Sequence, residues 1–135
     1  MKRIVGLILF ITFFNNIVYC LNWPFDPQNT APDVNKTLGD WNVGRYHDGI
    51  DFPKPKTTPV KNVKDGYVTY IDPSADDEGA IIICDSVTSD EGWLYAHIIV
   101  APEIKEGTYV PAGTPIGVVA DFDAGGALDS DDHLH

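Results

Sequence analysis

From Trp41 onward, short runs of hydrophobic and β-branched residues are separated by turn-forming residues. Ala80–Cys84 is a continuous apolar run, which indicates a buried strand, and residues 93–100 form a further strand candidate. Residues 107–117 carry a glycine or proline at nearly every second or third position, which favours short strands and tight corners. No helical period extends beyond about two turns.

Asp65-Gly66 separates two strand-like segments, residues 59–64 and residues 67–71. An Asp-Gly pair between such segments predicts a β-hairpin. Together with the many other short segments, this predicts an all-β fold: an antiparallel β-sandwich or half-barrel of short strands with little helix.

The composition bounds the size and the partners of the protein. A chain of 135 residues, 44% of them hydrophobic, is long enough for one globular domain with a core of its own. Its formal net charge of −11 argues against nucleic-acid binding, which needs a basic surface.

The N-terminus has the layout of a secretory signal peptide, which we place at residues 1–20. Lys2 and Arg3 precede an apolar run over residues 4–14 that is too short to span a membrane comfortably. The alternative is a buried N-terminal helix or strand. The signal peptide predicts a secreted protein, extracellular or periplasmic, without a stable membrane anchor.

Cys20 leaves a second possibility open, in which the chain is cut before this residue and lipidated on it. The bulky Tyr19 fits that alternative badly, so we favour a soluble product. Cys84 is then left without a partner, and we expect it to pack in the core. Residues 21–43 are rich in proline, which opposes helix and central strand, so we predict an extended lead-in whose Trp23 and Phe25 pack onto the domain.

The four histidines of the chain fall into three short clusters. His47 lies four residues before Asp51, His97 ends Tyr95-Ala96-His97, and the last cluster is His133-Leu134-His135. Singly, such clusters are common in β proteins. Because these clusters contain all four histidines of the chain, we expect them to converge on one site.

Strand geometry sets conditions on that convergence. Residues two apart on a strand share a face, so the side chains of His133 and His135 lie together while Leu134 points into the opposite layer. On a straight strand His47 and Asp51 would be about 13 Å apart, too far for one ion. Gly49 between them is the residue best suited to a bend, which predicts a kink at Asp48-Gly49.

Two histidines and one carboxylate are a ligand set that leaves a zinc ion with an open coordination position, as in catalytic zinc sites. Zinc in such a site polarises a carbonyl group and lowers the pKa of its bound water. The chain has neither HExxH nor a paired-cysteine motif, so the general base comes from elsewhere, and two further histidines remain for acid–base and oxyanion roles.

In this order, the three clusters resemble those of the lysostaphin-like (LytM-type) zinc metallopeptidases, which cut peptidoglycan peptides. That family carries His-x-Gly-x-Asp, then Tyr-x-His, then His-x-His. The segments Thr58-Pro59-Val60, Asp65-Gly66-Tyr67-Val68 and Val110 to Gly117 are also similar to that family. The resemblance covers residues 44–135, which we predict to be the metallopeptidase domain.

The resemblance implies that His47, Asp51 and His135 bind one Zn²⁺ and that His97 and His133 are the catalytic pair. It leaves open which of the two is the base and which stabilises the oxyanion. It implies a secreted zinc-dependent endopeptidase that hydrolyses amide bonds in peptidoglycan peptide stems or cross-bridges.

The sequence departs from the family pattern at its end. Acidic residues, Asp131 and Asp132, precede His133 where the family has a glycine-rich approach, and the sequence stops at His135 where family members continue with a further strand. We therefore expect a domain truncated at its C-terminal end, in which a ligand on a terminal residue is loosely held. The alternatives are a non-catalytic cell-wall-binding or regulatory module on the same fold and, third, a phosphotransfer domain that uses paired histidines.

Overall fold

The structure, a computed structural model, describes residues 22–42, 44–73, 79–121 and 132–135. Within these ranges the regular elements are all strands, and no helix there is long and apolar enough to cross a membrane. The predicted signal peptide with Cys20, and most of the acidic approach to His133, lie outside the described residues. The strands are β1 Trp41–Asn42, β2 Arg45–Tyr46, β3 Phe52–Pro53, β4 Pro59–Lys61, β5 Gly66–Asp72, β6 Ala80–Cys84, β7 Gly92–Ala96, β8 Ile98–Val100, β9 Tyr109–Val110, β10 Pro115–Val119 and β11 His133–Leu134.

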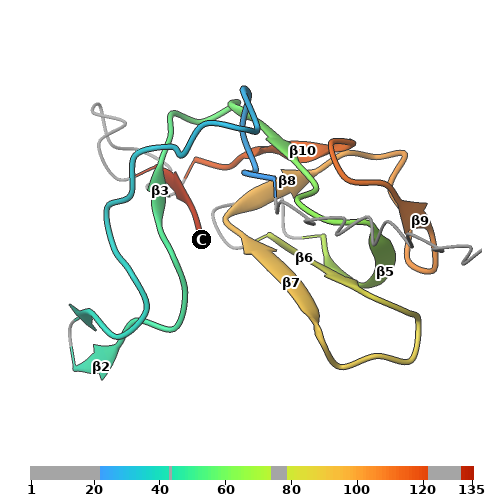
Figure 1. Ribbon diagram of the computed structural model, residues 1–135, viewed down its shortest axis with the longest axis horizontal. Coiled ribbons are helices and arrows are strands. Elements are labelled where there is room, and N and C mark those ends of the chain that lie inside the picture. Colours follow the sequence, from blue (N-terminus) through green and yellow to red (C-terminus); the bar gives the residue numbers. More distant parts are fainter. Residues whose placement is uncertain (1–21, 43, 74–78, 122–131) are drawn as a thin grey trace, which may run out of the picture.

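Two antiparallel sheets make up most of the fold (Figure 1). The larger has the order β7-β6-β5-β9, and the other has the order β4-β10-β8. Two short pairs, β11-β3 and β1-β2, complete the set. None of these sheets closes on itself, so the predicted all-β architecture of short antiparallel strands is confirmed.

The apolar faces of the two larger sheets meet in one core. Ile81 and Ile83 of β6 and Ile116 and Val119 of β10 are almost completely buried in it. Alternation along β6 is clear, since Ile82 points away from this face. The prediction that Cys84 packs in the core is confirmed, because its thiol is buried and free.

The predicted hairpin around Asp65-Gly66 is wrong. β4 pairs with β10, whereas β5 pairs with β6 and β9, so the two segments belong to different sheets. The buried side chain of Asn62 diverts the chain between them, because its amide group donates to the carbonyl oxygens of Lys64 and Val110. Asp-Gly is a local signal, and these tertiary hydrogen bonds override it.

The single strand predicted over residues 93–100 is divided at His97. Its φ of 59° is left-handed, which ends β7 and starts β8 in the other sheet. Such a backbone is uncommon for a residue with a side chain and is enriched at functional sites.

The proline-rich segment before the domain packs against the core, as predicted for Trp23 and Phe25. Both rings meet the ring of Phe52 edge to face, at centroid distances of 6.0 and 5.9 Å. The amide of Lys61 also donates to the carbonyl oxygen of Pro24. This segment is therefore tied to Phe52 of β3, which follows the His47–Asp51 cluster, and to Lys61 of β4.

Candidate metal centre

His47 and Asp51 flank the turn between β2 and β3, and both side chains are buried. The chain bends at Gly49, so the predicted kink at Asp48-Gly49 is confirmed. The bend brings His47 Nε2 to 3.0 Å from Asp51 Oδ1, where a straight strand would hold the two residues far apart.

His135 completes a triangle of donor atoms. Its Nδ1 lies 3.1 Å from His47 Nε2 and 3.0 Å from Asp51 Oδ1. Donor atoms of a tetrahedral zinc site with bonds of about 2.0–2.1 Å lie about 3.3 Å apart, close to these separations. The three residues implied as ligands by the sequence resemblance are therefore the ones whose donor atoms converge.

The hydrogen-bond partner of His47 Nδ1 indicates why this triangle suits a cation. His47 Nδ1 lies 3.2 Å from the carbonyl oxygen of Thr37, which can only accept, so that nitrogen carries the proton. The lone pair of Nε2 then faces the carboxylate of Asp51. Three acceptor atoms in mutual contact repel one another unless a proton or a cation lies among them, and a divalent metal ion removes that repulsion.

Asp48 supports the corresponding assignment for His135. Its exposed carboxylate lies 3.6 Å from His135 Nε2, the nitrogen that faces away from the triangle. A proton on Nε2 leaves Nδ1 as the donor atom. Each imidazole thus has an oxygen acceptor behind it, as zinc-binding histidines commonly do.

Gly49 has a second role that sequence reasoning missed. A Cβ atom placed on it would lie 2.5 Å from His135 Nε2 and 3.0 Å from Cε1. The residue therefore allows the His135 ring to lie against the backbone of the His47–Asp51 turn. The glycine itself was the signal in the sequence, but it predicted only the bend and not the contact with His135.

His135 is held on two sides, contrary to the expectation that a terminal ligand is loose. Ala96 and His135 exchange two backbone hydrogen bonds, of 2.8 and 3.2 Å, as an antiparallel pair does. One residue earlier, Leu134 is buried and pairs with Phe52 in β3. The described backbone at His135 is thus fixed between β7 and β3.

His97 and His133 lie together beside the triangle. Their ring centroids are 4.6 Å apart, and His133 Nε2 lies 3.8 Å from Asp51 Oδ1. The ring centroid of His97 is 6.4 Å from that of His135. The structure therefore brings all four histidines and Asp51 into one cluster, in which His97 and His133 are outside the donor triangle but within reach of a molecule bound at it.

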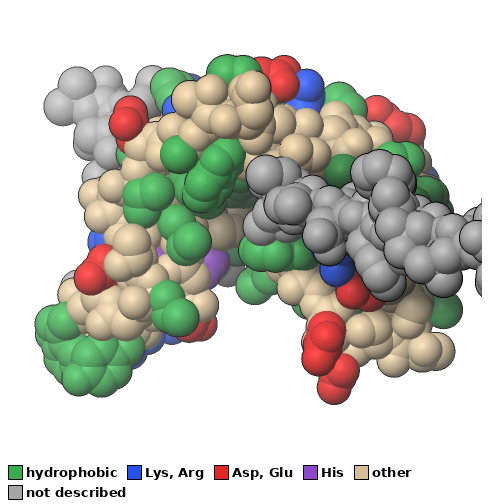
Figure 2. Space-filling view, in the orientation of Figure 1, with side chains coloured by type: hydrophobic (Ala, Val, Ile, Leu, Met, Phe, Trp, Pro, Cys, Tyr) green, Lys and Arg blue, Asp and Glu red, His purple; other side chains and the backbone are tan. Residues whose placement is uncertain are grey.

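The cluster is accessible from solvent. Figure 2 shows histidine side chains at the base of a notch between the arm that ends in the β1–β2 hairpin and the arm formed by β6 and β7. A cavity of about 390 Å³ opens beside His135, and Trp93, Leu94 and Ile50 are among its lining residues. A peptide can therefore approach the donor triangle from outside.

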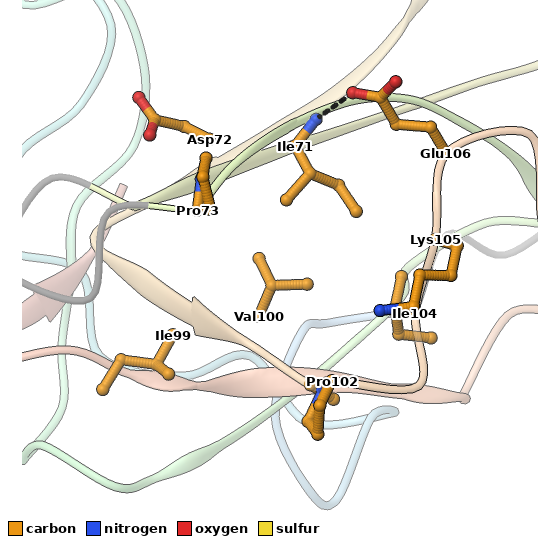
Figure 3. A pocket seen from close by; sticks show the side chains of 10 residues that line it. Ile71, Asp72, Pro73, Ile99, Val100, Pro102, Ile104, Lys105 and Glu106 are labelled. Carbon is orange, nitrogen blue, oxygen red and sulfur yellow. Dashed lines mark hydrogen bonds between the residues drawn. The ribbon is translucent and has the colours of Figure 1, made fainter.

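A second hollow, of about 400 Å³, lies at β5 and β8, away from the histidines (Figure 3). Ile71, Val100 and Ile104 line it, and the carboxylate of Glu106 accepts a hydrogen bond from the Ile71 amide at 3.1 Å. Its lining contains no histidine or cysteine, so it does not compete with the donor triangle as a metal site.

The tyrosine of Tyr95-Ala96-His97 is a structural anchor. Its hydroxyl donates to Asn62 Oδ1 and accepts from the Val63 amide, both at 2.9 Å. Burial raises the pKa of the Tyr95 phenol far above its usual value. Because these hydrogen bonds hold β7 against residues 62–63, they also fix the end of β7 that precedes His97.

The chain is similar to known proteins of the family that its motifs resemble. Residues 45–135 match peptidase family M23. No curated protein matches the chain. A peptidase M23 structure from Pseudomonas aeruginosa is similar over 85% of this chain and 42% of its own, with 22% identity and a TM-score of 0.61. A zinc-containing peptidase from Vibrio cholerae is similar over 85% and 35%, with 24% identity and a TM-score of 0.64.

A shorter neighbour is the catalytic domain of the prophage-encoded M23 protein EnpA from Enterococcus faecalis. It is similar over 78% of this chain and 82% of its own, with 23% identity and a TM-score of 0.57. At these identities the likeness establishes the fold. The chain spans less than half the length of the Pseudomonas and Vibrio proteins.

Proposed function

The chain belongs to peptidase family M23, and we propose that it is a zinc-dependent endopeptidase that hydrolyses amide bonds in peptidoglycan peptide stems or cross-bridges. The observation that supports this most strongly is the donor triangle of His47, Asp51 and His135 with 3.0–3.1 Å sides. Two imidazoles and one carboxylate suit a single zinc ion with an open position.

When bound, zinc supplies Lewis-acid polarisation of the scissile carbonyl group and a water molecule of lowered pKa. His47, Asp51 and His135 would hold it. The carbonyl oxygen of Thr37 accepts the ring proton of His47 on the side away from the ion, and the carboxylate of Asp48, 3.6 Å from His135 Nε2, favours a proton on that nitrogen electrostatically.

The remaining chemistry falls to His97 and His133. Both imidazoles lie beside the triangle, so a peptide bond placed next to it would meet them together. One ring takes a proton from the attacking water, and the other donates a hydrogen bond to the developing oxyanion. Both assignments of the two roles remain possible.

Peptidoglycan as the substrate is supported by the likeness of the three histidine motifs to those of lysostaphin-like peptidases. The open notch suits an extended peptide that enters and leaves along the surface. Secretion is part of this proposal and is supported by the basic and apolar pattern of residues 1–20, since the polymer lies outside the cytoplasmic membrane.

The test is hydrolysis of purified peptidoglycan by the zinc-loaded full chain, followed by quantification of new amino groups and mass spectrometry of the released peptides. We predict that His97→Ala lowers the rate by about 10²–10⁴-fold while zinc content stays at the wild-type value, because His97 acts on protons and not on the metal. Wall binding by wild type without release of amino groups would instead identify a non-catalytic cell-wall-binding module.

A further inference from the structure

The segment of residues 35–40 runs antiparallel to the turn that carries the first two metal ligands. Each ligand uses both its backbone N–H and its carbonyl oxygen in hydrogen bonds to this segment. The four bonds are His47 N to Asp40 O at 2.8 Å, Gly39 N to His47 O at 2.8 Å, Asp51 N to Lys36 O at 2.9 Å and Asn35 N to Asp51 O at 2.9 Å.

The same segment also contacts the ligand side chains. Thr37 accepts the Nδ1 proton of His47 on its carbonyl oxygen, at 3.2 Å, which fixes both the tautomer and the plane of the ring. The ammonium group of Lys36 lies 3.8 Å from Asp51 Oδ2, the oxygen outside the donor triangle. Both ligands are thus supported through backbone and side chain by residues that lie before them in the chain.

Asp40 holds Thr37 in the required conformation. Its Oδ2 accepts from the Thr37 amide at 2.7 Å and from the Thr37 hydroxyl at 3.1 Å, closing a tight local turn. The hydrogen bond from the Thr37 amide lowers the pKa of the Asp40 carboxyl. Asp40 is exposed, and its hydrogen bonds reach His47 through Thr37 and through its own backbone carbonyl oxygen, while its charge also acts on His47 through space.

The family match begins at residue 45, after this segment. We propose that residues 35–40 are a positioning segment of the metal centre, in which the Asp40–Thr37 turn orients the His47 imidazole and so sets the affinity for zinc. The inference rests on the proposed function, because it presupposes that His47 is a zinc ligand.

The first test compares substitutions of Asp40 in the full chain, with zinc affinity measured by competition against a chromophoric chelator. Asp40→Ala removes both bonds to Thr37, whereas Asp40→Asn keeps an oxygen acceptor. Substitution of a residue that orients a metal ligand costs about 10–100-fold in metal affinity, and a residue that acts through another one belongs at the lower end of this range. We therefore expect about tenfold weaker binding for Asp40→Ala and near wild-type binding for Asp40→Asn.

Asp65→Ala is the matched control. Asp65 is likewise exposed and accepts a backbone hydrogen bond, from Ala112 at 2.8 Å, but it lies in a loop away from the histidines. The proposal predicts no change in its zinc affinity. Equal zinc affinities for Asp40→Ala and Asp65→Ala would overturn the proposal.

A second pair of variants separates an effect on zinc binding from a general loss of stability. Gly39 and Gly107 both have left-handed φ values, of 88° and 79°, and a Cβ at either position meets nothing within 4 Å. An alanine therefore introduces similar backbone strain at both. We expect similar losses of thermal stability for Gly39→Ala and Gly107→Ala, but weaker zinc binding only for Gly39→Ala, since the Gly39 amide bonds to His47.

The ring itself provides a readout that needs neither zinc nor activity. Nitrogen-15 chemical shifts of the metal-free protein at pH 8 should show His47 protonated on Nδ1 in wild type and in Asp40→Asn, and a mixture of tautomers in Asp40→Ala. Unchanged tautomers in Asp40→Ala would contradict the inference about the positioning segment. Failure of wild type to bind zinc through His47 would contradict the proposed function itself, so the two failures are distinct.

Discussion

At the residue scale, Gly49 shows how one missing side chain allows the site to form. The His135 ring occupies the space where a Cβ would be, with Nε2 at 2.5 Å from that position. Gly49→Ala forces this ring or the turn to move, and His135 Nδ1 then leaves the donor triangle.

For Gly49→Ala we predict zinc affinity at least about tenfold weaker, as for other losses of ligand orientation, with only a small change in stability. Isothermal titration with zinc measures it. Wild-type affinity in Gly49→Ala would show that the ring position does not matter.

Tyr95 connects the histidine corner to the core through its hydroxyl group. Tyr95→Phe leaves the Val63 amide and Asn62 Oδ1 without this buried partner, which costs about 1–3 kcal/mol for each buried group left unsatisfied. Urea unfolding of the variant against wild type measures the difference in free energy of unfolding.

The raised pKa of Tyr95 adds a dependence on pH. In the unfolded chain this phenol ionises near pH 10, whereas in the folded chain it stays neutral, so the free energy of unfolding falls as the pH rises above about 10. In Tyr95→Phe, the decrease in the free energy of unfolding that comes from this phenol above about pH 10 should be absent. Identical slopes for both proteins between pH 9 and 11 would contradict the assignment of the shift to Tyr95.

At the scale of elements, β11 joins the core to the site. Leu134 is buried against β3, while its neighbours His133 and His135 face the site. Leu134→Ala should lower the free energy of unfolding by about 2–5 kcal/mol, as other buried leucine truncations do, and should weaken zinc binding with it.

Leu94→Ala provides the comparison, because Leu94 on β7 is 51% exposed. Denaturant titrations of both variants, with and without zinc, separate loss of packing from loss of the ligand. A Leu134→Ala protein as stable as Leu94→Ala would mean that β11 is not anchored as described.

The elements that could be predicted from sequence are those with a local signal. β6 follows from the run Ala80–Cys84, and the bend at Gly49 follows from the spacing of His47 and Asp51, the two predicted ligands. The pairing of β4 with β10 could not be predicted, because it depends on hydrogen bonds from Asn62 to residues distant in sequence. The division of the strand at His97 depends on a left-handed φ that no pattern of hydrophobic residues marks.

The candidate site was predictable as a set of residue types but not as a geometry. The histidines and the aspartate of the three motifs could be predicted to converge, because their side chains carry the metal-binding chemistry. Their support comes from backbone atoms, such as the carbonyl oxygen of Thr37, and any residue type supplies those. The role of residues 35–40 therefore left no signal in the sequence beyond the spacing of Thr37 and Asp40.

At the scale of the whole molecule, the candidate metal centre joins parts of the chain that are far apart in sequence. His47 and Asp51 come from the arm beside the β1–β2 hairpin, and His135 comes from β11, held between β3 and β7 (Figure 1). A zinc ion bound by all three would connect these parts directly. On the proposed function, metal binding would therefore stabilise the fold by mass action, by about 2.7 kcal/mol when free zinc is 100 times the dissociation constant.

Zinc content and zinc-dependent stability, measured on the same samples of wild type, His47→Ala and His97→Ala, test the central claim most directly. Wild type and His97→Ala should each bind one zinc ion per chain and lose stability when a chelator removes it. His47→Ala should bind none at the same free zinc concentration and should not respond to the chelator. One zinc ion retained by His47→Ala, with wild-type stability, would contradict a metal centre built from His47, Asp51 and His135.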